Sequence, residues 1–157
     1  MKANIALLPG DGIGPEVVQS AVQVLQAIAA KYTHQFSMQP YLIGGCAIDA
    51  HGQALPEATQ QACLAADAVL LGAVGGPQWS DPKAAVRPEQ GLLQLRALLN
   101  VFANVRPVKV FTRAAQFSPL KPERLLGVDF VFVRELTGGS YFGTKSRTEH
   151  DASDECR

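Results

Sequence analysis

The residues in this chain that are best suited to chemistry are three arginines and a tyrosine: Arg96, Arg106, Arg134 and Tyr141. The planar guanidinium of arginine can pair with a carboxylate through two parallel hydrogen bonds. The three arginines together could therefore clamp a dicarboxylate, and the tyrosine hydroxyl could supply a proton. A structural explanation is also open for each residue, because surface arginines are common and a tyrosine can simply pack in a sheet.

A second candidate site is the segment PEQGLLQLR, residues 88–96. Glu89, Leu92, Leu93 and Arg96 follow the spacing i, i+3, i+4, i+7, so they share one face of a predicted helix. Such a face could hold a ligand that is apolar at one end and anionic at the other. The same pattern is typical of a core stripe with charged edges, and periodicity alone leaves both interpretations open.

Two glycine-rich segments follow predicted strands. The segment PGDGIGPE, residues 9–16, resembles a phosphate-binding turn, because helix N-termini attract anions. However, Pro15 stands where the dinucleotide fingerprint GxGxxG needs its third glycine, and tight-turn chemistry alone would explain the glycines present. In GAVGGPQWSDPK, residues 72–83, Gly75 and Gly76 allow close approach of a ligand, and Trp79 could pack on a flat ring. The alternative is an ordinary glycine-rich loop with a half-buried tryptophan.

Composition and spacing argue against several classes of function. The chain has 157 residues with 14 basic and 14 acidic side chains and no basic block, which gives no electrostatic case for nucleic acid. No apolar run approaches membrane-spanning length. Three cysteines without a CxxC pair indicate reduced thiols in a cytoplasmic protein. The scattered histidines and the acids of DASDE, residues 151–155, lack the spacing of metal ligands, so no metal site is predicted in this chain.

The candidate residues must be positioned by the surrounding elements, and the pattern predicts an α/β fold. Short apolar runs predict strands, and apolar residues at helical spacing predict helices, the first of which begins at Pro15. Strands that alternate with helices predict a mainly parallel sheet flanked by helices. The predicted strands are 3–8, 35–42, 68–71, 108–111 and 130–134, the predicted helices include 56–65 and 88–100, and 73–88 is predicted as loop. The polar residues 148–157 are expected to be disordered.

Five segments in order along the chain carry a resemblance to a known family: LLPGDGIGPEV, GGCAIDAHGQALPEAT, DAVLLGAVGGPQW, RPEQGLLQLRALLNVFANVRPVK and VRELTGGSYFG. They resemble the isocitrate/isopropylmalate dehydrogenase family, and within it the 3-isopropylmalate dehydrogenases, over nearly all of residues 3–147. The resemblance implies an NAD-dependent, β-decarboxylating oxidoreductase of leucine biosynthesis that uses Mg²⁺ or Mn²⁺ and forms a homodimer. This family does not use the GxGxxG fold, which agrees with the missing third glycine.

The resemblance also implies a role for each candidate residue. Arg96, Arg106 and Arg134 match the arginines that hold the malate carboxylates, and Tyr141 matches the tyrosine that takes part in proton transfer around decarboxylation. Two further residues match the pocket for the isopropyl group, Leu92 and Leu93, and Glu89 matches the acid beside the nicotinamide. The residues that match other cofactor contacts are Ile13, Gly76, Pro77, Gln78 and Trp79.

The resemblance further implies a longer chain. Residues 1–100 match the N-terminal part of the first, cofactor-side domain, and residues 101–147 match the start of the second domain. The family's catalytic lysine, metal-binding aspartates and adenosine-binding loop lie beyond this segment, so the chain alone is expected to be an inactive fragment with no metal ligands of its own. Two alternatives stay open. One is a sister enzyme acting on isocitrate, homoisocitrate or tartrate, against which Leu92 and Leu93 argue, and the other is a non-catalytic remnant.

Overall fold

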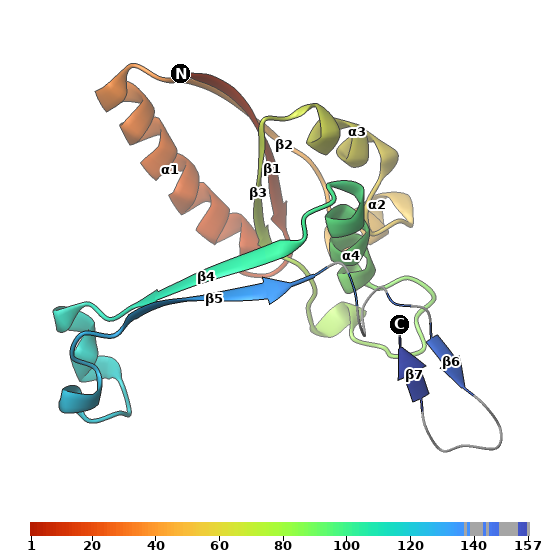
Figure 1. Ribbon diagram of the computed structural model, residues 1–157. Coiled ribbons are helices and arrows are strands. Elements are labelled where there is room, and N and C mark those ends of the chain that lie inside the picture. The colour runs from red at the N-terminus through yellow and green to blue at the C-terminus, as the bar shows by residue number, and fades with distance from the viewer. Residues whose placement is uncertain (137, 139–142, 144, 148–153, 157) are drawn as a thin grey trace. The chain divides into compact units, whose positions relative to one another are not determined.

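A computed structural model describes residues 1–136, 138, 143, 145–147 and 154–156 of the chain (Figure 1). The chain divides into two compact units, Met1–Leu99 and Asn100–Arg157. In the described part of the chain, no helix is both long enough and apolar enough to cross a membrane. The candidate residues are thus distributed over two separate bodies.

The first unit is built on a three-stranded parallel sheet, as the alternation of strands and helices predicted. The strand order is β2-β1-β3, and both neighbours run parallel to the central strand. Leu7, in that central strand, pairs with Pro40 on one side and Leu70 on the other. The strands are β1 (Lys2–Gly10), β2 (Gln35–Pro40) and β3 (Ala68–Ala73), which confirms the three predicted strands with small changes at their ends.

Four helices flank this sheet, one on one face and three on the other (Figure 1). The single helix starts at Gly14, one residue before the predicted Pro15, and ends at Thr33, whose φ of 57° is left-handed. One helix was not predicted, since it has only seven residues and is bounded by Gly44 and Gly52, which are typical of loops. The helices are α1 (Gly14–Tyr32), α2 (Gly45–His51), α3 (Glu57–Ala65) and α4 (Pro88–Leu98).

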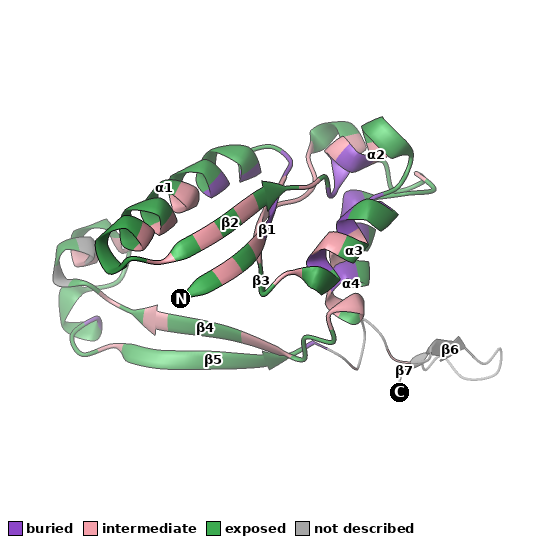
Figure 2. Cartoon of the chain, turned by 90° about the horizontal axis from the view of Figure 1, so that it is seen from above, coloured by how far each residue is buried: buried purple, intermediate pink, exposed green. Residues whose placement is uncertain are grey.

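The core of the first unit lies between the sheet and helices α3 and α4 (Figure 2). Leu8 of β1 is fully buried, and Cys63 of α3 and Leu95 of α4 pack into the same cluster. Complete burial of one leucine side chain stabilises a fold by about 1.5–3 kcal/mol. Leu95 therefore attaches α4, which carries four candidate site residues, to the central strand.

The second unit contains a long antiparallel ribbon of β4 (Ala103–Lys109) and β5 (Asp129–Glu135). The strand predicted at 108–111 overlaps β4 at Val108 and Lys109, but its bounds were wrong, because β4 starts five residues earlier and contains Pro107. Proline lacks the N–H that a central strand needs, but in the described part of the chain β4 pairs with β5 alone, and an edge strand tolerates proline. Two short 3₁₀ helices, Thr112–Phe117 and Pro122–Arg124, connect the strands, and β6 (Lys145–Arg147) pairs with β7 (Asp154–Cys156).

Candidate functional site

The carboxyl ends of β1 and β3 meet the start of α2 around one buried carboxylate. Asp11 is only 4% exposed. Its Oδ2 accepts hydrogen bonds from the backbone N–H groups of Gly45 and Gly75, and its Oδ1 accepts one from Cys46, each at 2.7 Å. Ligands in parallel α/β sheets bind at this edge, outside the carboxyl ends of the strands. Asp11 thus joins three segments that border the expected ligand site.

The turn after β1 has its glycines for packing reasons. A Cβ at Gly10 or at Gly14 would collide with backbone atoms of Ala73 in β3. The N–H of Asp11 donates to the carbonyl of Ala73 at 2.7 Å, so this amide is engaged within the chain. Tight packing against β3 therefore accounts for Gly10 and Gly14, whereas Gly12 is favoured by its positive φ of 55°. Ile13, in the same turn, has 58% of its surface exposed.

The glycine-rich loop after β3 is held at several points. Gly75 has a φ of +95°, a conformation that favours glycine, and residues Pro77–Trp79 form one 3₁₀ turn. The ring of Trp79 packs on Gly45, where an added Cβ would collide with the indole. The indole N–H also donates to Asp49 Oδ1 at 3.0 Å. Part of the half-buried tryptophan is therefore used for packing on α2, and its predicted contact with a ligand ring stays a prediction.

Helix α4 presents two different faces. Its buried face consists of Pro88, Gly91 and Leu95, and a Cβ on Gly91 would lie 2.5 Å from the carbonyl oxygen of Ala54. The predicted ligand face lies beside it, with Glu89 exposed and the other three residues half-buried: Leu92, Leu93 and Arg96. The stripe that packs into the core is therefore not the stripe that was proposed for the ligand.

Glu89 brings α4 next to the glycine-rich loop. A Cβ built on Gly75 would lie 3.0 Å from Glu89 Oε1, so the carboxylate borders the loop backbone directly. A Cβ built on Gly12 would lie 3.9 Å from the carbonyl oxygen of Gly75, which places the first turn beside the same loop. The structure thus gathers the sequence-predicted cofactor residues of the first unit around one loop.

In the second unit, Arg106 and Arg134 lie on one face of the ribbon. Arg134 of β5 lies opposite Asn104 of β4. Two positions further along, Arg106 of β4 lies opposite Phe132 of β5, so the two arginines are diagonal neighbours. Diagonal neighbours on one face of such a ribbon lie about 7–8 Å apart, which suits two cations that hold one small anion. Arg106 Nε donates to Asn104 Oδ1 at 2.9 Å, which orients its guanidinium. Arg106 lies in the middle of β4, whereas the predicted strand began only at residue 108.

The remaining predictions concern Arg96, Tyr141 and a metal. Arg96 belongs to the first unit, so its participation in one clamp with the arginine pair stays a prediction. Tyr141 lies outside the described residues. In the described part of the chain, no group of three His, Cys, Asp or Glu side chains could hold a metal ion. Asp11 was not predicted, although a single acid between two glycines at the end of a buried strand could have indicated it.

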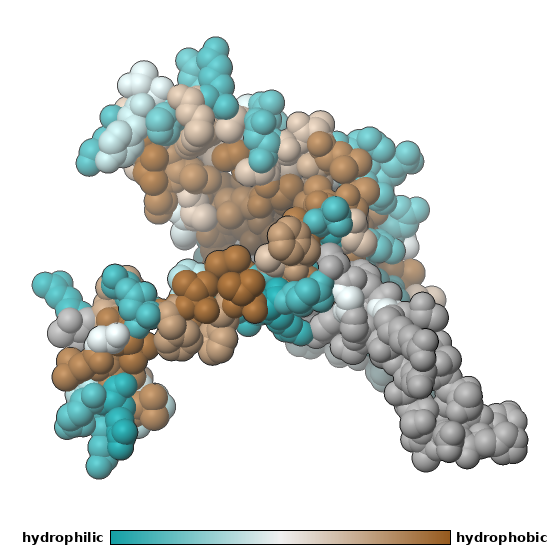
Figure 3. Space-filling view, viewed as in Figure 1, coloured by the Kyte–Doolittle hydropathy of each residue, from teal (hydrophilic) through white to brown (hydrophobic). Residues whose placement is uncertain are grey.

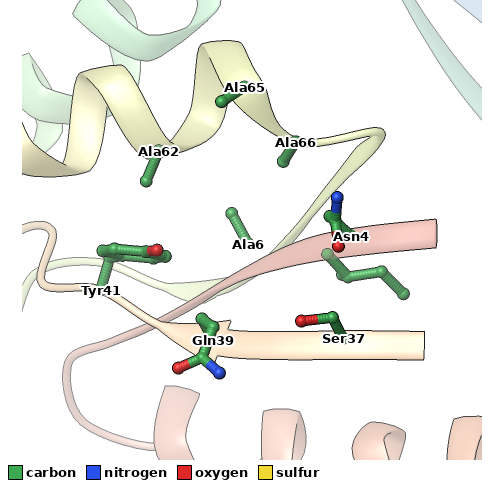
Figure 4. A pocket seen from close by; sticks show the side chains of 9 residues that line it. Asn4, Ala6, Ser37, Gln39, Tyr41, Ala62, Ala65 and Ala66 are labelled. Atoms are coloured by element: carbon green, nitrogen blue, oxygen red, sulfur yellow. The ribbon is translucent and has the colours of Figure 1, made fainter.

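A separate hollow lies on the face of the sheet that carries α3 (Figure 4). Its volume is about 220 Å³, and Ser37, Gln39 and Tyr41 border it opposite the alanines of α3. None of the described residues that line it is charged, and none is a predicted site residue. This hollow offers no cationic partner for a carboxylate among its lining residues, so the carboxyl ends of the strands remain the candidate site.

Two curated proteins are similar to most of this chain. A 3-isopropylmalate dehydrogenase from Bacillus licheniformis is 61% identical over 146 residues, which are 93% of this chain and 40% of that protein. Another from Anaeromyxobacter dehalogenans is 61% identical over 143 residues, or 91% of this chain and 40% of that protein. The chain thus spans about 40% of the length of these curated relatives.

Two solved structures and a family model are also similar to nearly all of this chain. A β-decarboxylating dehydrogenase from Thermococcus kodakarensis has a TM-score of 0.66 at 28% identity. The match covers 97% of this chain and 39% of that protein. An isocitrate dehydrogenase from Methylococcus capsulatus has a TM-score of 0.69 at 30% identity, and the match covers 98% of this chain and 41% of that protein. The model of the isocitrate/isopropylmalate dehydrogenase family matches residues 4–156. This chain therefore belongs to the isocitrate/isopropylmalate dehydrogenase family.

Proposed function

We propose that this chain is part of an enzyme that oxidatively decarboxylates 3-isopropylmalate with NAD. The observation that carries the proposal is the ligand face of α4, where two half-buried leucines and Arg96 follow Glu89, which borders the glycine-rich loop. A branched 2-hydroxy dicarboxylate has the matching chemistry, with an apolar branch and two carboxylates. The name shared by the relatives at 61% identity supports this substrate over isocitrate.

The substrate would be held by charge at its carboxylates and by apolar contact at its branch. Arg106 and Arg134 share one face of the ribbon, and together with Arg96 they would pair with the two carboxylates. Leu92 and Leu93 would accept the isopropyl group. In isocitrate this branch ends in a further carboxylate, which two leucines would leave without a polar partner.

NAD would lie against Ile13 and the loop Gly76–Trp79, with Glu89 at the nicotinamide end. The residues suit this ligand, because the loop is fixed by the Asp11 hydrogen bond to Gly75 and Ile13 leaves an apolar side chain exposed. When bound, NAD accepts the hydride from the hydroxyl-bearing carbon. The Mg²⁺ or Mn²⁺ of the family finds no ligand cluster in the described part of the chain, so no step is assigned to it here.

The proton that follows decarboxylation is assigned to Tyr141. Loss of carbon dioxide leaves an electron pair on the neighbouring carbon, and the tyrosine hydroxyl would protonate that carbon. The complete enzyme would act in the cytoplasm as a homodimer, as the resemblance implies. Free Cys46 and Cys63 are consistent with a reducing compartment.

The arginine pair provides the test of this assignment. A hybrid would join this chain to the region of the Bacillus licheniformis relative that it does not match, and NADH formation would be followed. We expect Arg106→Gln to raise the KM for 3-isopropylmalate by about tenfold or more, because a charged hydrogen-bonded pair is lost. Arg113→Gln is the matched control, since Arg113 is an exposed arginine of the same unit. Equal kinetics of the two variants would reject the clamp.

A further inference from the structure

The carboxylate of Asp11 connects backbone segments that are remote in sequence. Gly45 and Gly75 lie 34 and 64 residues further along the chain, yet both donate to the same oxygen at 2.7 Å. Hydrogen bonds from N–H groups to an ionised carboxylate are short and stronger than neutral ones. A buried polar group is retained at low cost only when it is fully paired, and three N–H donors surround this one.

Gly44 lies directly against the Asp11 carboxylate. A Cβ on Gly44 would collide with Asp11 Oδ2, so the close approach of this carboxylate requires a glycine at position 44. An asparagine of the same size keeps one carbonyl oxygen but turns an NH₂ group toward at least one N–H donor. The site therefore favours a side chain with two acceptor oxygens, which an aspartate carboxylate provides and an asparagine does not.

We propose that Asp11 is a positioning residue that fixes the cofactor-facing loop before any ligand binds. The carboxylate holds Gly75 in the loop and Gly45 in α2, and Trp79 packs on that same Gly45. Gly75 in turn borders Glu89. A loop that is already ordered does not have to lose conformational entropy when its ligand arrives. The cofactor part of this inference rests on the proposed function, whereas the positioning of the loop does not.

Trp79 makes the inference measurable, because it is the sole tryptophan in the chain. Its emission and acrylamide quenching would be recorded without nucleotide in the hybrid with the Bacillus licheniformis relative, with any tryptophan of the added region changed to phenylalanine, and in the Asp11→Asn and Asp11→Ala variants of that hybrid. We expect emission at longer wavelength and stronger quenching in both variants, with unchanged far-ultraviolet circular dichroism. Asp67→Asn is the matched control, since the exposed Asp67 carboxylate also accepts a backbone N–H, from Asn4 at 2.8 Å. Unchanged Trp79 emission in a folded Asp11→Ala hybrid would overturn the proposal.

A second measurement uses the unaltered hybrid, so it does not depend on whether the Asp11 variants fold. Amide hydrogen exchange should show Gly75 as strongly protected as Gly45 and Cys46, because all three donate to the same carboxylate. Exchange of the Gly75 amide at the rate of an unprotected loop would reject the positioning role. Both readouts are taken without NAD, so a failure to bind NAD would reject the proposed function and leave the positioning result intact.

Discussion

At the scale of single residues, the sequence identified those candidate site residues whose side-chain type alone shows their chemistry. Arg106 and Arg134 were selected as carboxylate partners, and the register of the ribbon puts them on one face. Asp11 was missed because its three N–H donors come from segments remote in sequence, and its place between two glycines at a strand end was the only local signal. The effect of that carboxylate extends to the half-buried thiol of Cys46.

The thiol of Cys46 should react slowly in the folded chain. Burial is the main cause that raises its pKa above the ordinary 9.0, and the nearby charge of Asp11 raises it further. Since the folded pKa exceeds the unfolded one, the thiol's stabilising contribution is complete below about pH 9 and is lost as pH rises through the folded pKa. The measurement is iodoacetamide labelling of Cys46 at mildly alkaline pH, with peptides resolved by mass spectrometry.

We expect slower labelling of Cys46 in the folded chain than in the urea-unfolded chain, and a rate that climbs as the solution becomes more alkaline. Cys63 is the control, because burial raises its pKa with no charged neighbour involved. Equal labelling rates for folded and unfolded Cys46 would contradict the environment described for it.

At the scale of elements, apolar patterns located the helices and strands of the first unit, but two elements were misjudged. Helix α2 escaped prediction because its flanking Gly44 and Gly52 read as loop signals. Strand β4 was placed too late because Pro107 suggests a strand boundary, whereas an edge strand accepts it. Local patterns thus predict elements well where neither glycine nor proline interrupts them.

Substitutions on the two faces of α4 should have different effects, one mainly on stability and the other mainly on substrate binding. Leu95 is 4% exposed and belongs to the core cluster, so Leu95→Ala should lower the free energy of unfolding by about 2–5 kcal/mol. Leu92 is half-buried, so Leu92→Ala should cost about 1 kcal/mol and act mainly on the KM for 3-isopropylmalate in the hybrid. Urea unfolding of the two variants in the hybrid makes the comparison, and an equal loss of stability would show that Leu92 is a core residue.

At the scale of the whole molecule, several apolar faces have no cover in the described part of the chain. Val17, Val24 and Ile28 of α1 are 40–59% exposed, although they belong to its apolar stripe. Hydrophobic side chains also gather over the ribbon, where Phe130 and Phe132 stack edge-on at 5.0 Å (Figure 3). Periodicity identifies such residues as apolar but does not say what covers them.

The isolated chain should therefore be only marginally folded. Exposed apolar faces of this extent stabilise little and favour association. We expect a broad unfolding transition and a heat-capacity change below the usual value of about 12–15 cal/mol/K per residue. Calorimetry combined with sedimentation would measure both, and cooperative unfolding of a monomer with the usual heat-capacity change would contradict this expectation.

The most direct measurement is NADH formation with 3-isopropylmalate, NAD and magnesium, by this chain alone and by the hybrid with the Bacillus licheniformis relative. We expect no rate from the chain alone, and a rate from the hybrid that is higher with 3-isopropylmalate than with isocitrate. A hybrid that folds but oxidises isocitrate in preference, or neither compound, would contradict the proposed function. A rate from the purified chain alone would contradict the view that it holds only part of the site.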